Sequence, residues 1–253
     1  MGQVLVAYSG GVDSSFLLKR AVMELGPGAK GVIVKSESLP TQDWLAAKAR
    51  AARWGAELLE LEVRELSHPE LAQNDQNRCY HCKTLSYAEI LALGQTLGIP
   101  LVLDGTNADD LKDYRPGRKA AQEKGVISPL AQVGLTKNEI RHLSRTLGLE
   151  TWDHPSSPCL NSRVPYGQPI TGEKLLRIEA AEAYLKSLGF LELRVRHHEG
   201  LARIEVPQKD LGRALGLAQE IESKLKTLGF TWVTLDLGGL RSGSLNLGIG
   251  IGT

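Results

Sequence analysis

The sequence has no long apolar run. None of its apolar stretches approaches the roughly 20 residues that a membrane-spanning helix needs. We also expect no secretory signal, because Met1 and Gly2 lead directly into the first expected strand rather than into a charged segment followed by an apolar one. We therefore expect a soluble, cytoplasmic protein with no membrane partner.

Charge of one sign is not in excess either. The chain has 30 basic and 29 acidic residues, which gives a net charge of +1, and neither kind gathers in a tract. Proteins that bind nucleic acids usually present a clear excess of Lys and Arg to the phosphates, so nucleic acid is not expected as the main partner. The length of 253 residues is sufficient for a full hydrophobic core, in one large domain or two modest ones.

Cysteine is scarce, and an odd number of three residues does not build a disulfide framework. Cys79 and Cys82 form a C-x-x-C motif, and Cys159 stands alone. Such a motif serves zinc sites, iron–sulfur clusters or redox pairs, and three inert thiols are the remaining alternative. A zinc site would need His81 or His154 as its fourth ligand, but His81 lies between the two thiols and would often point away from a shared metal.

Three thiolates suit a [4Fe–4S] cluster whose fourth iron is open to an exogenous ligand. A competing interpretation makes Cys159 a nucleophile whose pKa is lowered by a cation such as Arg163. The cluster and the reactive-cysteine interpretations are compatible, since a sulfide bound to the cluster would replace the Cys159 thiol as sulfur donor. A thioredoxin-type pair would follow a strand and open a helix, whereas Gln76-Asn77-Arg78 precedes this motif.

The usual phosphate loop of ATPases is absent, because no G-x-x-x-x-G-K-[ST] occurs. The chain instead begins with a strand, a Gly-containing turn and an apolar helical pattern. This order leaves the first-turn N–H groups of the helix free to bind an anion at the positive end of its dipole. An ordinary Gly turn is the alternative. The expected ligands of the anion and of a divalent cation are Ser9, Gly10, Gly11, Asp13, Ser14 and Ser15.

The first 150 residues alternate strands and helices, which predicts a buried parallel sheet of βαβ units with helices on both faces. The expected strands are Val4–Ala7, Gly31–Val34, Glu57–Leu61 and Leu101–Leu103. The expected helices are Ser14–Leu25, Thr41–Arg53, Tyr80–Leu97 and Thr136–Leu147.

Ligands of such sheets bind beyond the carboxyl ends of the strands, where the Gly turn and the polar segment Asp104–Asp110 both fall. Together they predict a nucleotide cleft. Asp109 and Asp110 would either bind Mg²⁺ or cap a turn. From this segment the expected nucleotide contacts are Gly105, Thr106, Asn107 and Asp110.

The remaining chain predicts a smaller α+β domain. Residues 151–172 are proline-rich and read as a cysteine-bearing loop or linker between residues 1–150 and 173–253. Segments YLKSLGFLELRV from Tyr184 and KLKTLGFTWVTL from Lys224 suggest two related helix–strand units with a Gly cap, unless the similarity is due to chance. A Gly-rich loop is expected after Leu237. The expected elements are helices Glu173–Leu188 and Asp210–Leu228 and strands Leu191–Arg196, Ala202–Val206 and Trp232–Leu237.

The Gly turn SGGVDSS resembles the SGGxDS loop of the PP-loop ATP pyrophosphatases, which cleave ATP to AMP and pyrophosphate. Nearly end to end, the chain resembles the LarE family. These are ATP-dependent sulfur transferases that build the nickel-pincer nucleotide cofactor of lactate racemase. The motifs that carry the resemblance are DGTNADDLKDYRPG at 104–117, GVISPL at 125–130, GLTKNEIR at 134–141, SSPCLNSRVPYGQPIT at 156–171, LRVRHHEGLARIEV at 193–206 and VTLDLGGLRSGSLN at 233–246.

The resemblance implies an adenine nucleotide alpha hydrolase-like fold that binds ATP and Mg²⁺. A carboxylate of pyridinium-3,5-biscarboxylic acid mononucleotide would attack the α-phosphorus, and pyrophosphate would leave. A sulfur nucleophile would then displace AMP from the acyl adenylate to give a thiocarboxylate, and the second carboxylate would follow. Inorganic sulfide or another donor would supply the sulfur, and the protein would form a homo-oligomer such as a hexamer.

Family members differ in their sulfur source. In one type the cysteine matching Cys159 gives up its own sulfur and becomes dehydroalanine. In the other, three cysteines hold a [4Fe–4S] cluster with an extra sulfide. This chain has Cys79, Cys82 and Cys159 at those three positions, so the cluster is favoured.

The resemblance also implies a set of substrate-binding residues. Arg194 and Arg196 share one face of a strand, where two guanidinium groups suit a phosphate, although a solvated strand face is the alternative. His197 and His198 are expected to be structural. The residues implied to surround the substrate are Ser162, Arg163, Glu182, Arg194, Arg196, Glu205 and Arg241.

Three other functions compete with this one. A tRNA thiolase shares the PP-loop but usually has a basic surface or an RNA-binding module. An ammonia-dependent amidating ligase would not need Cys159. A nucleotide-binding regulator would release no pyrophosphate.

Overall fold

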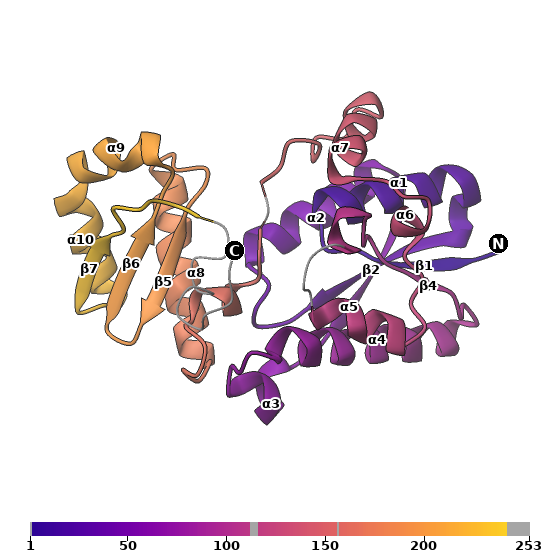
Figure 1. The fold of residues 1–253 in the computed structure, drawn as a ribbon, viewed down its shortest axis with the longest axis horizontal. Coiled ribbons are helices and arrows are strands. Elements are labelled where there is room, and N and C mark those ends of the chain that lie inside the picture. Colours follow the sequence, from indigo (N-terminus) through magenta and orange to yellow (C-terminus); the bar gives the residue numbers. More distant parts are fainter. Residues whose placement is uncertain (1, 112–115, 156, 242–253) are drawn as a thin grey trace. The chain divides into compact units, whose positions relative to one another are not determined.

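The computed structural model describes residues 2–111, 116–155 and 157–241 (Figure 1). The chain divides into two compact units, each described here by itself. The first unit comprises Met1–Glu65 and Asn77–Ser157, and the second unit comprises Leu66–Gln76 and Pro158–Thr253. Residues 237–241 form turns and bends, and the rest of the expected Gly-rich loop, from 242 onward, lies outside the described residues.

Within its described residues, the first unit contains a parallel sheet of four strands in the order β3-β2-β1-β4. The predicted parallel sheet is confirmed, with strand ends that differ from the expected ones by at most two residues. Its central strand is buried and apolar, as a strand covered on both faces requires. The strands are β1 (Val4–Ala7), β2 (Ala29–Lys35), β3 (Glu57–Glu62) and β4 (Val102–Leu103).

Helices cover both faces of this sheet, as predicted (Figure 1). The longer ones are α1 (Val12–Leu25), α2 (Thr41–Arg53), α4 (Arg78–Leu97), α5 (Pro116–Glu123) and α7 (Lys137–Thr146). Val4 and Val6 of β1 share one apolar core with α1, α2 and α7, whereas Leu5 shares the other with α4 and α5. This alternation follows the two-residue period of a strand. No helix in the described part of the chain has both the length and the apolar content for crossing a bilayer.

Some helix positions differ from the sequence prediction. Helices α1 and α4 each begin two residues earlier than expected, so Val12–Asp13 and Arg78–Cys79 are helical rather than part of the preceding turns. Two short helices, α3 (Pro69–Ala72) and α6 (Pro129–Gln132), and the longer α5 were not predicted. Each of these three begins with proline, which fits the first position of a helix but reads as a breaker in sequence.

The second unit is built on a small mixed sheet in the order β5-β6-β7. Strand β6 pairs antiparallel with β5 and parallel with β7. The helix expected over Asp210–Leu228 is divided at Leu217, next to the poor helix former Gly216. Its elements are α8 (Gly172–Ser187), β5 (Arg194–His198), β6 (Leu201–Glu205), α9 (Leu211–Gly216), α10 (Ala218–Thr227) and β7 (Trp232–Leu235).

Both predicted helix–strand units contain the expected glycine at the end of the helix. Gly189 after α8 and Gly229 after α10 have φ values of 89° and 96°, which favour glycine. In both places the next residue, Phe190 or Phe230, donates its N–H to a carbonyl of the last helical turn and is buried in the core. Both ends are therefore Schellman caps that turn the chain from a helix toward a strand. Strand β5 begins at Arg194, three residues later than expected, because the chain bends after Phe190.

The proline-rich segment, expected to be an ordered loop or linker, contains a short helix and several buried residues. Leu160–Arg163 form a 3₁₀ helix, and Cys159 is its N-cap residue. Leu160, Val164 and Ile170 are buried together with Leu175 of α8. This loop thus belongs to the core of the second unit.

Candidate functional site

The Gly turn joins β1 to the N-terminus of α1. Gly11 is the N-cap of α1 and supplies no capping side chain, and Asp13 lies in the first turn. The orphan N–H groups of that turn are therefore available to an anion. This places the predicted anion site at the carboxyl end of the central strand of the sheet.

Helix α2 holds the turn from one side. Gly10 has a φ of 78°, and a Cβ there would lie 3.0 Å from Ala47 Cβ and 3.1 Å from Arg50 Nη2. Arg50 is buried and donates through Nη2 to the Gly10 carbonyl at 3.3 Å. A glycine is thus required at Gly10 both for its backbone angle and for space. Sequence reasoning missed Arg50, which occupies an ordinary position of a helical pattern.

The serines of the turn have different surroundings. Ser14 Oγ accepts from the Ser9 N–H at 3.2 Å, lies 3.1 Å from Ser9 Oγ and reaches the Gly11 carbonyl at 3.3 Å. Ser15 is fully buried, and its hydroxyl has no hydrogen-bond partner among the described residues. Ser9 and Ser14 therefore lie together within the turn, whereas Ser15 lies in the interior.

The loop after β4 lies directly on the first turn of α1. A Cβ on Gly105 would be 2.8 Å from the Ser14 backbone nitrogen and 3.1 Å from the Asp13 carbonyl carbon. Only a residue without a side chain fits against backbone at that distance. The structure thus brings together the two polar loops that the sequence placed at one edge of the sheet.

Asp104 anchors this second loop. Its carboxylate accepts from the Tyr87 hydroxyl at 2.8 Å, from Thr106 Oγ1 at 3.0 Å and from Ser128 Oγ at 2.7 Å. Burial, together with the negative charge of Asp104, raises the pKa of Tyr87, which stays protonated and donates. Asp104 is 4% exposed and was not among the expected site residues.

Asn107, Asp109 and Asp110 cap the turn that follows. Asn107 Oδ1 accepts from the N–H groups of Asp109 at 2.9 Å and Asp110 at 3.1 Å. Asp110 Oδ2 accepts from the Asn107 N–H at 3.1 Å, and Asp109 Oδ2 from the Lys137 N–H at 2.9 Å. The structure contains the turn-capping contacts expected for these aspartates. Their expected role in binding Mg²⁺ stays a prediction.

Asp13 is paired with a lysine that sequence reasoning missed. Lys137 is the first residue of α7, and its Nζ lies 2.5 Å from Asp13 Oδ2. The other carboxylate oxygen, Oδ1, is buried and has no hydrogen-bond partner among the described residues. A carboxylate with one oxygen available suits a divalent cation such as Mg²⁺. Lys137 lies in the GLTKNEIR motif, which was the only signal for it in the sequence.

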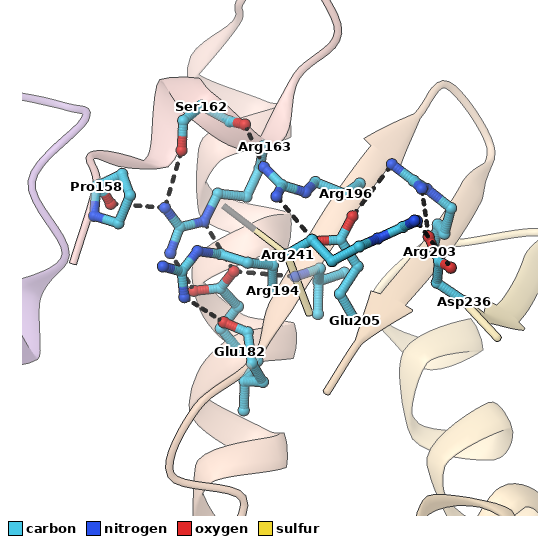
Figure 2. A network of polar contacts seen from close by, with 12 residues as sticks. Pro158, Ser162, Arg163, Glu182, Arg194, Arg196, Arg203, Glu205, Asp236 and Arg241 are labelled. Atoms are coloured by element: carbon cyan, nitrogen blue, oxygen red, sulfur yellow. Dashed lines mark hydrogen bonds and ion pairs between the residues drawn. The ribbon is translucent and has the colours of Figure 1, made fainter. Parts of the chain in front are cut away.

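In the second unit, a buried ion pair joins the cysteine loop to α8 (Figure 2). Arg163 donates from Nε and Nη2 to the two oxygens of Glu182, both at 2.9 Å. Glu182 also accepts from the Val195 N–H at 3.0 Å. Arg163 and Glu182 are 2% and 4% exposed, so this bidentate pair is shielded from water.

The same arginine wraps the backbone around Cys159. Arg163 Nη1 donates to the carbonyls of Pro158 at 2.6 Å and Cys159 at 3.1 Å, and lies 3.0 Å from Ser162 Oγ. The structure thus brings four of the expected residues together: Cys159, Ser162, Arg163 and Glu182.

A second ion-pair network continues from the Ser162 carbonyl, which accepts from Arg196 Nη1 at 2.7 Å (Figure 2). Arg196 Nη2 lies 2.8 Å from Glu205, which also pairs with Arg203 at 3.2 Å. Arg203 and Asp236 were not predicted, although Arg203 lies directly opposite Arg196 in the β5–β6 ladder.

Positive charge is in excess in this network. Burial, together with the positive charges of Arg163 and Arg196, lowers the pKa of Arg194 to about 10, against the opposite effect of Glu182. Arg241 reaches Asp236 at 3.7 Å. Five arginines thus face three carboxylates, an arrangement that attracts an anion. They are Arg163, Arg194, Arg196, Arg203 and Arg241 against Glu182, Glu205 and Asp236.

None of the three cysteines takes part in a disulfide. Cys79 and Cys82 lie three residues apart at the start of α4 in the first unit, and Cys82 Sγ donates to Glu65 Oε1 at 3.4 Å. Cys79 is exposed, and Arg78 Nη2 lies 3.9 Å from its sulfur. Cys159 is half-buried in the second unit. Within the described ranges, no group of three or more His, Cys, Asp or Glu side chains is arranged to hold a metal.

Comparison with known proteins places the chain in a family. No family model matches it. An uncharacterised protein of Synechocystis sp. is 43% identical over 251 residues, which cover 97% of this chain and 92% of the relative. The pyridinium-3,5-bisthiocarboxylic acid mononucleotide synthase of Lactiplantibacillus plantarum is 38% identical over 245 residues, with coverages of 96% and 89%. An uncharacterised protein of Methanocaldococcus jannaschii is 29% identical over 243 residues, with coverages of 95% and 91%. The chain therefore belongs to the LarE-like sulfur transferases, a family of ATP-dependent enzymes.

Proposed function

We propose that this enzyme uses ATP to convert the carboxylates of pyridinium-3,5-biscarboxylic acid mononucleotide to thiocarboxylates, releasing AMP and pyrophosphate. The observation that carries the proposal is the 38% identity with the Lactiplantibacillus plantarum synthase over 96% of the chain. The anion-binding turn in the first unit and the arginine network in the second unit support it.

In the first unit, the Gly turn would bind the phosphates of ATP. The N–H groups at the start of α1 and the hydroxyls of Ser9 and Ser14 would donate to phosphate oxygens. Asp13 would hold Mg²⁺ through its available oxygen, and Lys137 lies beside it to balance the charge of pyrophosphate as it leaves. Gly10, Gly11 and Gly105 would let the nucleotide approach the backbone, with Ser15, Thr106, Asn107 and Asp110 supporting the two loops.

The reaction follows from leaving-group chemistry. A carboxylate oxygen is a poor leaving group, so direct attack by sulfur on the substrate fails. When the carboxylate oxygen attacks the α-phosphorus of ATP, the bond to pyrophosphate breaks and an acyl adenylate remains. Sulfur then attacks the acyl carbon, and AMP leaves with the original carboxylate oxygen. The same two steps convert the second carboxylate.

In the second unit, the arginine network would bind the substrate. Arg194 and Arg196 present planar groups that match two phosphate oxygens. Arg163 and Glu182 would fix the loop that carries Ser162, while Glu205 and Arg241 would complete the charge pattern around the mononucleotide.

The sulfur source is the finer part of the proposal. The chain has three cysteines, Cys79, Cys82 and Cys159, and three thiolates are the donors that a [4Fe–4S] cluster with one open iron would need. When bound, such a cluster supplies an extra sulfide as the sulfur nucleophile. The alternative is that Cys159 gives up its own sulfur. This alternative is supported by the contact between Arg163 and the Cys159 carbonyl, which holds the cysteine beside an expected substrate residue.

An anaerobic preparation separates the two sources. The cluster predicts visible absorbance. It also predicts iron and labile sulfide in amounts that correspond to one cluster per protein chain. The sacrificial mechanism predicts neither, and a loss of one H₂S per chain in the intact mass after reaction.

The function itself is tested by product analysis. The chain, ATP, Mg²⁺, the dicarboxylate mononucleotide and sulfide should yield thiocarboxylate and AMP in equal amounts. Thiolated tRNA as the preferred product would support a tRNA thiolase instead. An amide formed from ammonia, with full activity in Cys159→Ser, would support an amidating ligase, and absence of pyrophosphate release would support a regulator.

The proposal also assigns a role to each of three segments of the chain. Residues 1–150 would bind ATP, 151–172 would carry the reactive cysteine, and 173–253 would serve substrate binding and assembly. We propose a cytoplasmic homo-oligomer, for which a hexamer is the state to test by light scattering coupled to gel filtration.

A further inference from the structure

A short segment distant in sequence is part of the second unit and holds the cysteine loop. Leu66–Gln76 belongs to this unit, although it lies some 90 positions before the loop. Its Asn74 donates from one side-chain nitrogen toward three loop carbonyls. The acceptors are Val164 at 3.3 Å, Pro165 at 2.8 Å and Gln168 at 3.0 Å.

Both the backbone angle and the hydrogen-bond partners restrict which residue type fits at Asn74. Its φ is 59°, in the left-handed region that glycine and asparagine tolerate best, and it is 0% exposed. The two N–H donors of its amide face three carbonyl oxygens, which an aspartate would repel and a glycine would leave without these bonds. Asparagine thus satisfies both the backbone angle and the acceptors.

Backbone bonds complete the clamp. The Gly167 N–H donates to the Asn74 carbonyl at 3.0 Å, and the Ile170 N–H donates to the Ala72 carbonyl at 2.8 Å. Leu66, from the same segment, packs on the apolar cluster that contains Leu160 and Val164. The segment therefore fixes the loop immediately after the 3₁₀ helix.

Cys159 lies at the other end of that 3₁₀ helix. Arg163 holds the helix from the N-terminal side, through the carbonyls of Pro158 and Cys159. Val164, whose carbonyl accepts from Asn74, is the C-cap residue of the same four-residue helix. Two anchors, one at each end of the helix, thus hold the backbone of the segment that begins at Cys159.

We propose that Asn74 is a positioning residue for Cys159. It acts through the loop carbonyls that accept from its amide. The placement of the sulfur then depends on a residue that lies 85 positions away in sequence. The inference goes beyond the proposed function, because it concerns where the thiol is held and not the reaction that the thiol serves.

Two variants test it. Asn74→Gly keeps access to the positive φ and removes the amide, whereas Asn74→Ala removes the amide and strains the backbone. The control is Glu199→Gly, because Glu199 is the other described non-glycine residue with positive φ, at 56° in the turn between β5 and β6. It changes a backbone of the same kind in the same unit without touching the loop.

The first readout needs no activity. Alkylation by iodoacetamide, followed by peptide mapping, measures the reaction rate of Cys159 against Cys79 in the same chain. We expect about tenfold faster alkylation of Cys159 in Asn74→Gly. The variant loses the hydrogen bonds of the Asn74 amide, and their net contribution to holding the loop closed corresponds to a change of about this size. Faster amide exchange at Gly167 and Ile170 should accompany it, with no change in Glu199→Gly. Unchanged rates in folded variants would overturn the proposal. So would unfolding of both variants at the assay temperature, since Asn74 would then serve the folding of the whole unit.

The second readout separates positioning from general loss of structure. With the proposed reaction, kcat for thiocarboxylate formation should fall about fivefold in Asn74→Gly, while the KM for ATP stays within twofold. A parallel change in both constants would contradict a positioning role. If the wild-type chain shows no sulfur transfer at all, the proposed function fails, and the alkylation result still decides the role of Asn74.

Discussion

At the scale of single residues, the two oxygens of the Asp13 carboxylate have different surroundings. One oxygen lies 2.5 Å from Lys137 Nζ, and the other is buried without a hydrogen-bond partner among the described residues. An unsatisfied buried acceptor costs about 1–3 kcal/mol. A divalent cation brought by ATP would remove that cost. We therefore expect this carboxylate to contribute more to nucleotide binding than to the free energy of unfolding.

The variant Asp13→Asn keeps the shape of the side chain and removes its charge. We expect pyrophosphate release to fall on the order of 100-fold, because the metal and the developing charge lose their partner. Asp153→Asn, an exposed carboxylate of the same unit, is the control and should leave the rate unchanged. A rate within twofold of wild type in Asp13→Asn at saturating Mg²⁺ would refute the role of Asp13.

The Arg163–Glu182 pair makes a prediction about stability. Glu182→Gln is nearly isosteric, but it leaves the buried guanidinium without its counter-charge. Breaking such a pair costs about 3 kcal/mol of unfolding free energy, which urea denaturation followed by circular dichroism measures. Glu24→Gln breaks the exposed Arg20–Glu24 pair and should change little. Equal effects of the two substitutions would mean that burial does not strengthen the Arg163–Glu182 pair.

At the scale of elements, the site of the first unit depends on how closely two loops approach. Gly105 lies so close to the backbone of Ser14 that even a Cβ would collide, at 2.8 Å. Backbone, unlike a flexible side chain, cannot move away cheaply. The loop after β4 and the first turn of α1 therefore form one rigid arrangement.

Gly105→Ala should separate these two loops and weaken ATP binding about tenfold, measured by calorimetry with a non-hydrolysable analogue. Gly212→Ala is the matched control, because Gly212 lies in α9, where an added Cβ would meet no atom within 4 Å. That change should leave affinity unaltered and slightly favour the helix. Unchanged affinity in Gly105→Ala would show that the nucleotide does not depend on the contact between the loops.

Element prediction from sequence succeeded where apolar periodicity is strong. Helix α2 begins and ends at the expected residues, and β1 does so as well. Three helices that begin with proline were missed, since Pro69, Pro116 and Pro129 read as breaks although proline fits a first helical turn. The break at Leu217 was missed because the apolar pattern continues through it.

Residues of the candidate site divide in a similar way. The Gly turn, the cysteines and the strand arginines carry motif signals and were predicted. Arg50, Lys137 and Asp236 were not, because each meets its partner only through the tertiary fold. Asn74 is the clearest example, since no local pattern shows that it contacts residues 164–168.

At the scale of the whole molecule, a buried histidine predicts how stability depends on pH. His197 is 2% exposed, lies against Phe230 and has no hydrogen-bond partner on either ring nitrogen within the described structure. Burial lowers its pKa to about 4, and the nearby Arg177 and Lys174 act in the same direction. His198, on the opposite side of the strand, contacts Arg203 at 3.2 Å, so the expected structural role of the pair agrees with its surroundings.

The sign of the effect follows from the two states. The unfolded chain protonates this histidine near pH 6.5, whereas the folded chain does so only near pH 4. Between these values the unfolded state binds more protons, so stability falls as the pH drops from about 6.5 to 4, by on the order of 3 kcal/mol. Above pH 6.5 the group contributes nothing. The variant His197→Leu should flatten this part of the stability curve, and His142→Gln, an exposed histidine, should not. A wild-type curve that is flat from pH 7 to 4.5 would contradict the prediction.

One labelling experiment tests the central claim, that the carboxylate is activated by adenylation before sulfur attacks it. The dicarboxylate mononucleotide is prepared with ¹⁸O in its carboxylates and incubated with the enzyme, ATP, Mg²⁺ and sulfide. The account predicts that each AMP released carries one ¹⁸O, because the oxygen that attacked the α-phosphorus leaves with AMP. Unlabelled AMP formed together with thiocarboxylate would contradict it.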